Sequence, residues 1–227
     1  MNEAWQRDRP ARGWGGSWAA GITQSRRRVG PALLLLAAMC ANAPAQESAQ
    51  RAHHHHQAAT SGAPVERTEH TYSVPDVMLK DTNGKSVALR PLLEVKEPVM
   101  LDFIYTSCTA VCPLLSETFA QVERELGSEA VGLRMVSISI DPEYDTPKVL
   151  RAYAQTYQAG AQWQFLTGSP NDVAEVQKAF DAYRANKMDH VALVFIRTSQ
   201  AKPWIRFEGL VTPTALAREY RAMHSAP

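Results

Sequence analysis

Two cysteines separated by four positions are the residues of this chain best suited to chemistry. Cys108 and Cys112 stand in the segment Tyr105–Pro113, directly after an apolar run and directly before a predicted helix. This spacing allows one turn of backbone to bring both sulfurs within disulfide distance, or within reach of one metal ion. Unpaired N–H groups and the positive end of the helix dipole lower thiol pKa values and favour the thiolate. The pair is therefore predicted to be redox-active or metal-binding.

A structural disulfide is the alternative interpretation of the pair, and it is the common fate of two cysteines in an exported protein. However, hydrophobic residues make up 45% of the chain and lie mainly after His70, so a core can form there without a covalent staple. A junction between a strand and a helix is also a typical place for functional residues. We therefore favour a functional pair.

His190 is the third candidate, because Asp189 and His190 directly precede the apolar segment 191–197. We expect a parallel sheet to place a residue at this point on the same edge as the cysteine loop. Two thiolates and one imidazole would then converge. Such a soft donor set suits Cu(I) and, with rearrangement, Cu(II), whereas zinc normally takes a fourth ligand. Taken alone, His190 also fits an ordinary loop histidine.

The elements that must position these residues are those of an α/β domain. An Asn-Gly step in Asp81–Lys85 predicts a hairpin turn near the start of the domain. Two buried strands and the helix between them predict a parallel βαβ unit. The predicted strands are 77–79, 87–89, 99–105, 133–140, 191–197 and 204–208. Together with helices they predict a central mixed β-sheet flanked by helices, with an N-terminal β-hairpin.

Helix boundaries follow from proline, glycine and hydroxyl residues. Pro113 suits the first helical position and restricts Cys112 to an extended conformation, while Gly127 suits the position after the last turn. Three later helix starts share a hydroxyl residue followed by proline, at Thr146, Ser169 and Thr212. The predicted helices are 113–126, 147–158, 171–184 and 213–223.

Residues 1–45 are predicted to be a signal peptide. Arg26–Arg28 precede the apolar run Val29–Met39, which is too short to span a bilayer comfortably. Cleavage is expected near Ala45, with Ala43 as an alternative site. Export to the periplasm follows, with proximity to the membrane if the signal stays uncleaved. Cys40 lies in the apolar segment and is removed on cleavage, which leaves the mature chain two cysteines.

Residues 46–69 have the composition of a flexible linker, rich in Ala, Gln, Ser, Gly and Pro without an apolar period. The linker contains His53–His56, which could collect copper or zinc or simply belong to a disordered polar tract. The domain itself is predicted to span residues 70–227. The chain has 24 basic and 23 acidic residues, so it lacks the basic field that binds a nucleic-acid backbone.

Several segments in order resemble the SCO/SenC family of copper-binding assembly proteins over residues 77–211. They are Phe103–Thr106 before the Cys-x-x-x-Cys-Pro motif, Ser137–Pro147, Phe165–Gly168 and Asp189-His190. The resemblance implies a thioredoxin-like fold and one copper ion bound by Cys108, Cys112 and His190. It also implies that the protein delivers copper to the dinuclear copper centre of a terminal oxidase such as cytochrome c oxidase, or reduces the cysteines of that centre.

The segment around the cysteines departs from the family pattern at three positions. Thr109 and Ala110 stand where many members have Pro-Asp, and Ile104 stands where Gly is frequent. These differences bear on copper affinity and on the choice of partner more than on the fold. Relatives with variant loops are suspected of thiol redox work or of serving other copper enzymes.

The main alternative is thiol–disulfide exchange without metal delivery, in which one thiol attacks a partner's disulfide and the other resolves the mixed disulfide. A reductant for the thiols would then be a further partner. An oxidoreductase of this fold usually has a cis-proline facing the cysteines, whereas this chain has Asp189-His190, which favours a metallochaperone over an enzyme. A peroxidase and a purely structural module fit the sequence less well. Met135, Met188 and Met223 are scattered and form no copper-relay motif.

Overall fold

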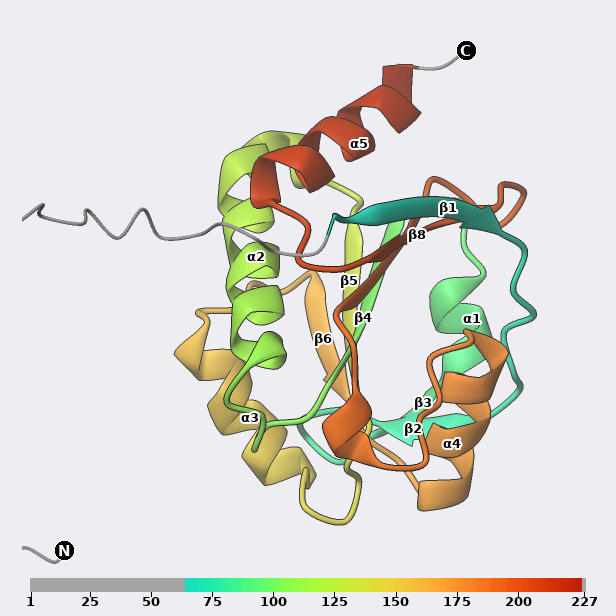
Figure 1. Cartoon of the computed structure of the whole chain (residues 1–227), viewed down its shortest axis with the longest axis vertical. Coiled ribbons are helices and arrows are strands. Elements are labelled where there is room, and N and C mark those ends of the chain that lie inside the picture. The colour runs from blue at the N-terminus through green and yellow to red at the C-terminus, as the bar shows by residue number, and fades with distance from the viewer. Residues whose placement is uncertain (1–63, 226–227) are drawn as a thin grey trace, which may run out of the picture. The chain divides into compact units, whose positions relative to one another are not determined.

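A computed structural model describes residues 64–225. A six-stranded sheet runs through this part of the chain in the order β1-β8-β7-β4-β5-β6, and β2 and β3 form a separate hairpin (Figure 1). The strands are β1 (Glu66–His70), β2 (Met78–Lys80), β3 (Ser86–Ala88), β4 (Val99–Ile104), β5 (Arg134–Ser139), β6 (Trp163–Leu166), β7 (Leu193–Arg197) and β8 (Trp204–Glu208). The sheet is mixed, as predicted, because β4, β5 and β6 pair in parallel whereas β7 pairs antiparallel with both β4 and β8.

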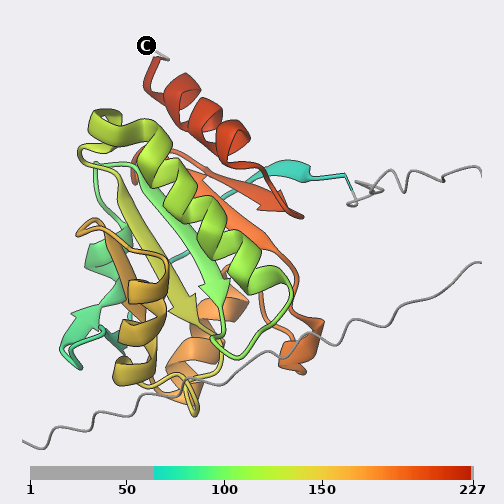
Figure 2. The same ribbon diagram turned by 90° about the vertical axis from the view of Figure 1, so that its left-hand side faces the viewer.

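Helices cover both faces of the sheet. They are α1 (Leu89–Leu93), α2 (Val111–Leu126), α3 (Pro147–Thr156), α4 (Pro170–Ala179) and α5 (Pro213–Ser225), with short 3-10 helices η1 (Gly127–Ala130) and η2 (Lys187–Asp189). One hydrophobic cluster joins the sheet to α2, α3 and α5. In Figure 2, α2 (green) and α3 (gold) lie in front of the strands, and α5 (red) lies at the top, beside α2. A second cluster on the other face joins the sheet to α1, α4 and the β2–β3 hairpin. These two layers confirm the predicted α/β class.

The local signals for turns and caps are confirmed. The hairpin turn closes with Gly84 at φ 77°, donating its N–H to the carbonyl of Asp81 at 2.9 Å. The hydroxyls of Thr146, Ser169 and Thr212 each accept a backbone N–H from the residue three positions later. These bonds satisfy N–H groups that the first helical turn leaves without a partner.

Helix α2 begins earlier than predicted. It starts at Val111, so Cys112 is helical and not extended, and Pro113 occupies the third position of the helix. Proline is tolerated there because the first N–H groups of a helix have no intrahelical partner, and this outweighed the conformational bias on the preceding residue. The helix ends as predicted at Gly127, whose φ is 49°.

Three elements were missed from the sequence. β1 lies inside the range 46–69 predicted as linker and pairs antiparallel with β8, so the ordered chain starts before residue 70. β6 and α1 are each of four or five residues, too short to show a clear period. The predicted signal peptide, its cleavage sites and His53–His56 lie outside the described residues. Within residues 64–225, no helix is long and apolar enough to cross a membrane.

The buried face of α2 provides a test of the packing in the hydrophobic cluster that joins the sheet to α2, α3 and α5. Phe119 is fully buried, and its ring lies 5.6 Å from that of Trp163. We expect Phe119→Ala to lower the free energy of unfolding by about 3–5 kcal/mol, because it removes buried area and leaves a cavity. Urea denaturation measures this. Leu114→Ala, on the exposed side of the same helix, is the control and should change stability by less than about 1 kcal/mol. Equal effects of the two substitutions would contradict this packing.

Candidate metal centre

The two cysteines lie where β4 passes into α2. Cys108 is on the connecting loop with 7% of its surface exposed, and Cys112 is fully buried in the first turn of α2. Both are free thiols. The backbone N–H of Cys112 donates to the sulfur of Cys108 at 3.5 Å. The structure therefore brings the predicted pair together and presents Cys108 as its outer member.

The two thiols differ in acidity. Burial by itself would raise the pKa of Cys108, but the N–H groups of Cys112 and Ala110 outweigh burial and hold this pKa below its ordinary value. Burial raises the pKa of Cys112 strongly, and the nearby charges of Cys108 and Asp102 add to this. Hydrogen bonds to the charged form favour the thiolate, whereas burial without them favours the thiol. Cys108 therefore has the more acidic thiol of the pair.

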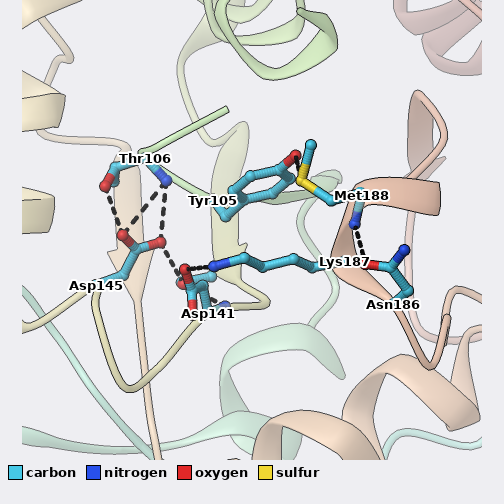
Figure 3. A network of polar contacts seen from close by, with 8 residues as sticks. Tyr105, Thr106, Asp141, Asp145, Asn186, Lys187 and Met188 are labelled. Atoms are coloured by element: carbon cyan, nitrogen blue, oxygen red, sulfur yellow. Dashed lines mark hydrogen bonds and ion pairs between the residues drawn. The ribbon is translucent and has the colours of Figure 1, made fainter. Parts of the chain in front are cut away.

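A buried carboxylate fixes the loop that carries Cys108. Asp145 accepts hydrogen bonds from the backbone N–H and the hydroxyl of Thr106, and from the hydroxyl of Ser139 at 2.6 Å (Figure 3). These bonds connect the loop before Cys108 to the end of β5. Asp145 thus has a structural role, because its carboxylate is fully buried and accepts hydrogen bonds from Thr106 and Ser139.

His190 lies at the same end of the sheet as the cysteine loop. Its Nε2 is 2.9 Å from the carbonyl oxygen of Phe103, and its ring meets the ring of Tyr105 edge-on with centroids 6.2 Å apart. Its Nδ1 is buried and has no hydrogen-bond partner among the described residues. Because a carbonyl only accepts, Nε2 must carry the hydrogen, and the lone pair then resides on Nδ1.

The electrostatics of His190 favour the neutral ring. Burial lowers its pKa, and the charge of Arg184 lowers it further, against the opposing effect of the Phe103 carbonyl. A neutral imidazole with one nitrogen bonded to a backbone carbonyl and the other free is the form that binds metal ions.

The strand pairing that places His190 is the opposite of the one expected. β7 runs antiparallel to β4, with Asp102 opposite Val194. The start of β7 therefore lies beside the end of β4, which puts His190 near the cysteine loop. In a parallel pair the start of one strand lies beside the start of the other, at the far edge from the loop. The predicted location is right, but the argument from a parallel sheet is wrong.

The three predicted ligands do not form a coordinating set in this conformation. Within residues 64–225, no group of three His, Cys, Asp or Glu side chains is arranged so that it could hold a metal ion. Tyr105 stands among them. Its ring contacts His190, and its hydroxyl helps to lower the pKa of Cys108. The donor types fit a soft metal ion, and coordination by all three requires the loop or Tyr105 to shift.

Asp102 and Tyr105 are the residues at this site that the sequence reasoning did not assign. Asp102 is fully buried in β4, and neither of its carboxylate oxygens has a hydrogen-bond partner among the described residues. Burial raises its pKa to about 7, and burial likewise raises that of Tyr105 to about 12. The available signal for Asp102 was a single acidic residue inside an apolar strand.

Comparison with known proteins identifies the family. A sequence model described as SCO1/SenC matches residues 66–225. The chain belongs to the SCO1/SenC family. The SCO1 protein homolog of Bacillus subtilis is 34% identical over 114 residues, which are 49% of this chain and 58% of that protein. The mitochondrial SCO2 homolog of Bos taurus is 35% identical over 88 residues, 37% of this chain and 32% of that protein. The chain thus spans less than two thirds of the length of these relatives.

Solved Sco structures share the fold. Bradyrhizobium japonicum ScoI, solved with copper bound, is 26% identical with a TM-score of 0.56, over 66% of this chain and 99% of that one. BsSco is 25% identical with a TM-score of 0.59, over 70% of this chain and 98% of that one. It is described as having a disulfide switch and as a member of the Sco family of cytochrome c oxidase assembly proteins. The predicted family and thioredoxin-like fold are confirmed.

The unequal thiols of this SCO1/SenC domain predict unequal reactivity. In reduced, metal-free protein we expect iodoacetamide to alkylate Cys108 roughly tenfold or more faster than Cys112, because Cys108 is the less buried of the two and its pKa is lowered. Peptide mass spectrometry after timed quenching measures both sites. As pH falls through the lowered pKa of Cys108, its rate should drop, at a lower pH than for an ordinary cysteine. Both sites should react equally in urea; equal rates in the folded protein would contradict the assignment.

The carboxylate of Asp145 predicts a stability effect. We expect Asp145→Ala to lower the free energy of unfolding by about 2–4 kcal/mol, because the partly buried donors of Thr106 and the buried hydroxyl of Ser139 lose their acceptor. Urea denaturation measures this. Glu143→Ala, at an exposed position of the same segment, should stay within about 0.5 kcal/mol of the unsubstituted protein. An unchanged free energy of unfolding in Asp145→Ala would show that the loop does not depend on this carboxylate.

Proposed function

We propose that this protein is an exported copper chaperone that binds one copper ion through Cys108, Cys112 and His190. It delivers the copper to the dinuclear copper centre of cytochrome c oxidase or a related copper enzyme, or reduces the cysteines of that centre. The observation that carries the proposal is the buried, unpartnered Nδ1 of His190 at the same end of the sheet as two free thiols.

The donor set supports copper over harder ions. Two thiolates and one imidazole are soft ligands, and Cu(I) accepts such a low-coordinate set, whereas a structural zinc ion takes a fourth protein ligand. Each thiol gives its proton to solvent when it binds as the thiolate. The Phe103 carbonyl, at 2.9 Å from Nε2, keeps the hydrogen on that nitrogen and leaves Nδ1 to bind metal.

The unequal exposure of the cysteines supports delivery by ligand exchange. Both cysteines are buried, but Cys108 keeps 7% of its surface exposed whereas Cys112 keeps none. A thiol of the partner can therefore approach a copper ion from the side of Cys108, and the ion passes on as bonds to the partner replace bonds to this chain. Export depends on the signal peptide predicted for residues 1–45, and the periplasm is the compartment that we propose.

Thiol–disulfide exchange is the second candidate function. The specific observation in its favour is the acidity difference between the thiols, with the pKa of Cys108 lowered and that of Cys112 raised. This is the arrangement of an attacking and a resolving thiol. In this case His190 would position the thiols and hold no metal.

Anaerobic Cu(I) titration separates the two functions. The chain is used with His53–His56 all replaced by Ser, so that these imidazoles do not compete, and is compared with the same chain carrying His190→Ala. We expect one copper per chain, sulfur and imidazole ligands in X-ray absorption, and at least roughly tenfold weaker binding with no imidazole signal in the variant. His70→Ala, at a histidine in β1, is the matched control and should bind like the parent.

If the parent chain retains no copper but rapidly reduces a test disulfide, the delivery function fails and a thiol oxidoreductase remains.

A further inference from the structure

Met188 is an exposed methionine whose sulfur is nevertheless held in place. Its side chain belongs to η2, and the residue is 70% exposed. The hydroxyl of Tyr105 donates to its sulfur at 3.7 Å, and the two groups face one another in Figure 3. An exposed methionine buries too little area to stabilise a core appreciably. Core packing therefore does not explain a large apolar side chain at this position.

The turn that carries Met188 is fixed at several points. The backbone N–H of Met188 donates to the side-chain oxygen of Asn186 at 3.0 Å, and that of His190 donates to the carbonyl of Lys187 at 3.2 Å. Lys187 forms an ion pair with Asp141 and lies 5.6 Å from the centre of the Tyr105 ring. The turn is thus tied both to the segment after β5 and to Tyr105, as Figure 3 shows.

Tyr105 connects this sulfur to the proposed copper ligands. Its hydroxyl donates to the sulfur of Met188, its ring lies against His190, and its carbonyl accepts the backbone N–H of Cys108 at 3.1 Å. Residues that carry a thioether, an imidazole and a thiol therefore each contact this one aromatic residue. A shift of Tyr105 would release the sulfur of Met188 from the phenol hydroxyl that now donates to it.

We propose that Met188 is an additional ligand for Cu(I) and the first group of this chain to receive it. The inference rests on the proposed copper function. A thioether is a soft ligand that selects Cu(I), and this one is the most exposed sulfur at the site. A bond from copper to Met188 forms as a bond to the incoming carrier breaks. No electron moves, and the thioether has no proton to release. The thiolates of Cys108 and Cys112 bind next, each giving one proton to solvent.

Packing is the competing account of Met188, because sulfur also makes favourable contacts with aromatic rings. Leucine separates the two roles, since it keeps the apolar volume and removes the sulfur. Met135, by contrast, is fully buried in β5. Met78 is 54% exposed on β2 and is the matched control for loss of an exposed sulfur.

The test compares Met188→Leu and Met78→Leu in the chain whose His53–His56 are replaced by Ser. Affinities for Cu(I) are measured anaerobically by competition with a chromophoric chelator, and affinities for Cu(II) by direct titration. We expect Met188→Leu to weaken Cu(I) binding about tenfold, equivalent to about 1.4 kcal/mol, with little change for Cu(II). X-ray absorption of the Cu(I) form should lose one sulfur ligand. Met78→Leu should match the parent in every measurement.

Two results would overturn the role of Met188 and leave the proposed function standing. One is an unchanged Cu(I) affinity and sulfur count in Met188→Leu. The other is an equal loss of Cu(I) and Cu(II) binding, which indicates packing against Tyr105. If the parent chain itself binds no copper, the proposed function and this inference fail together.

Discussion

The site depends on the antiparallel pairing of β4 with β7. β4 leads into the cysteine loop, and β7 begins just after His190, so two segments some eighty residues apart meet because the strands run in opposite directions. The same pairing brings the imidazole to the Phe103 carbonyl at the end of β4. β5, parallel to β4 on its other side, ends at Ser139 and leads to Asp145, which holds the loop from that side. A change in either pairing would separate the proposed ligands.

Burial gives each donor its chemical character. The thiol of Cys112 and the carboxyl of Asp102 are both fully buried, and burial disfavours their charged forms. Both pKa values are therefore raised. Cys108 escapes this because backbone N–H groups at the start of α2 stabilise its thiolate. Burial likewise keeps His190 neutral, with one nitrogen free. The proposed ligands are thus an outer thiol of lowered pKa, an inner thiol of raised pKa and an imidazole nitrogen with no hydrogen-bond partner among the described residues.

Helix caps and turns could be predicted from the sequence better than the pairing of strands. The caps at Thr146, Ser169 and Thr212, the hairpin turn and the end of α2 at Gly127 follow from single residues and their neighbours. The strand β1 could not be found in this way, because Glu66–His70 carries no apolar alternation and is held only by β8. For the same reason the direction of β7 and the contact of Met188 with Tyr105 were hidden, since both depend on residues far apart in the chain.

The protonation and bonding of the His190 ring test the central claim most directly. In protein labelled with ¹⁵N-histidine, long-range ¹H–¹⁵N spectra distinguish the two ring nitrogens, and Cu(I) is diamagnetic and does not broaden them. We predict that before copper is added Nε2 carries the hydrogen, and that one equivalent of Cu(I) shifts the Nδ1 signal of His190 while Nε2 stays protonated. Unchanged nitrogen signals of His190, with copper bound to the protein, would contradict it.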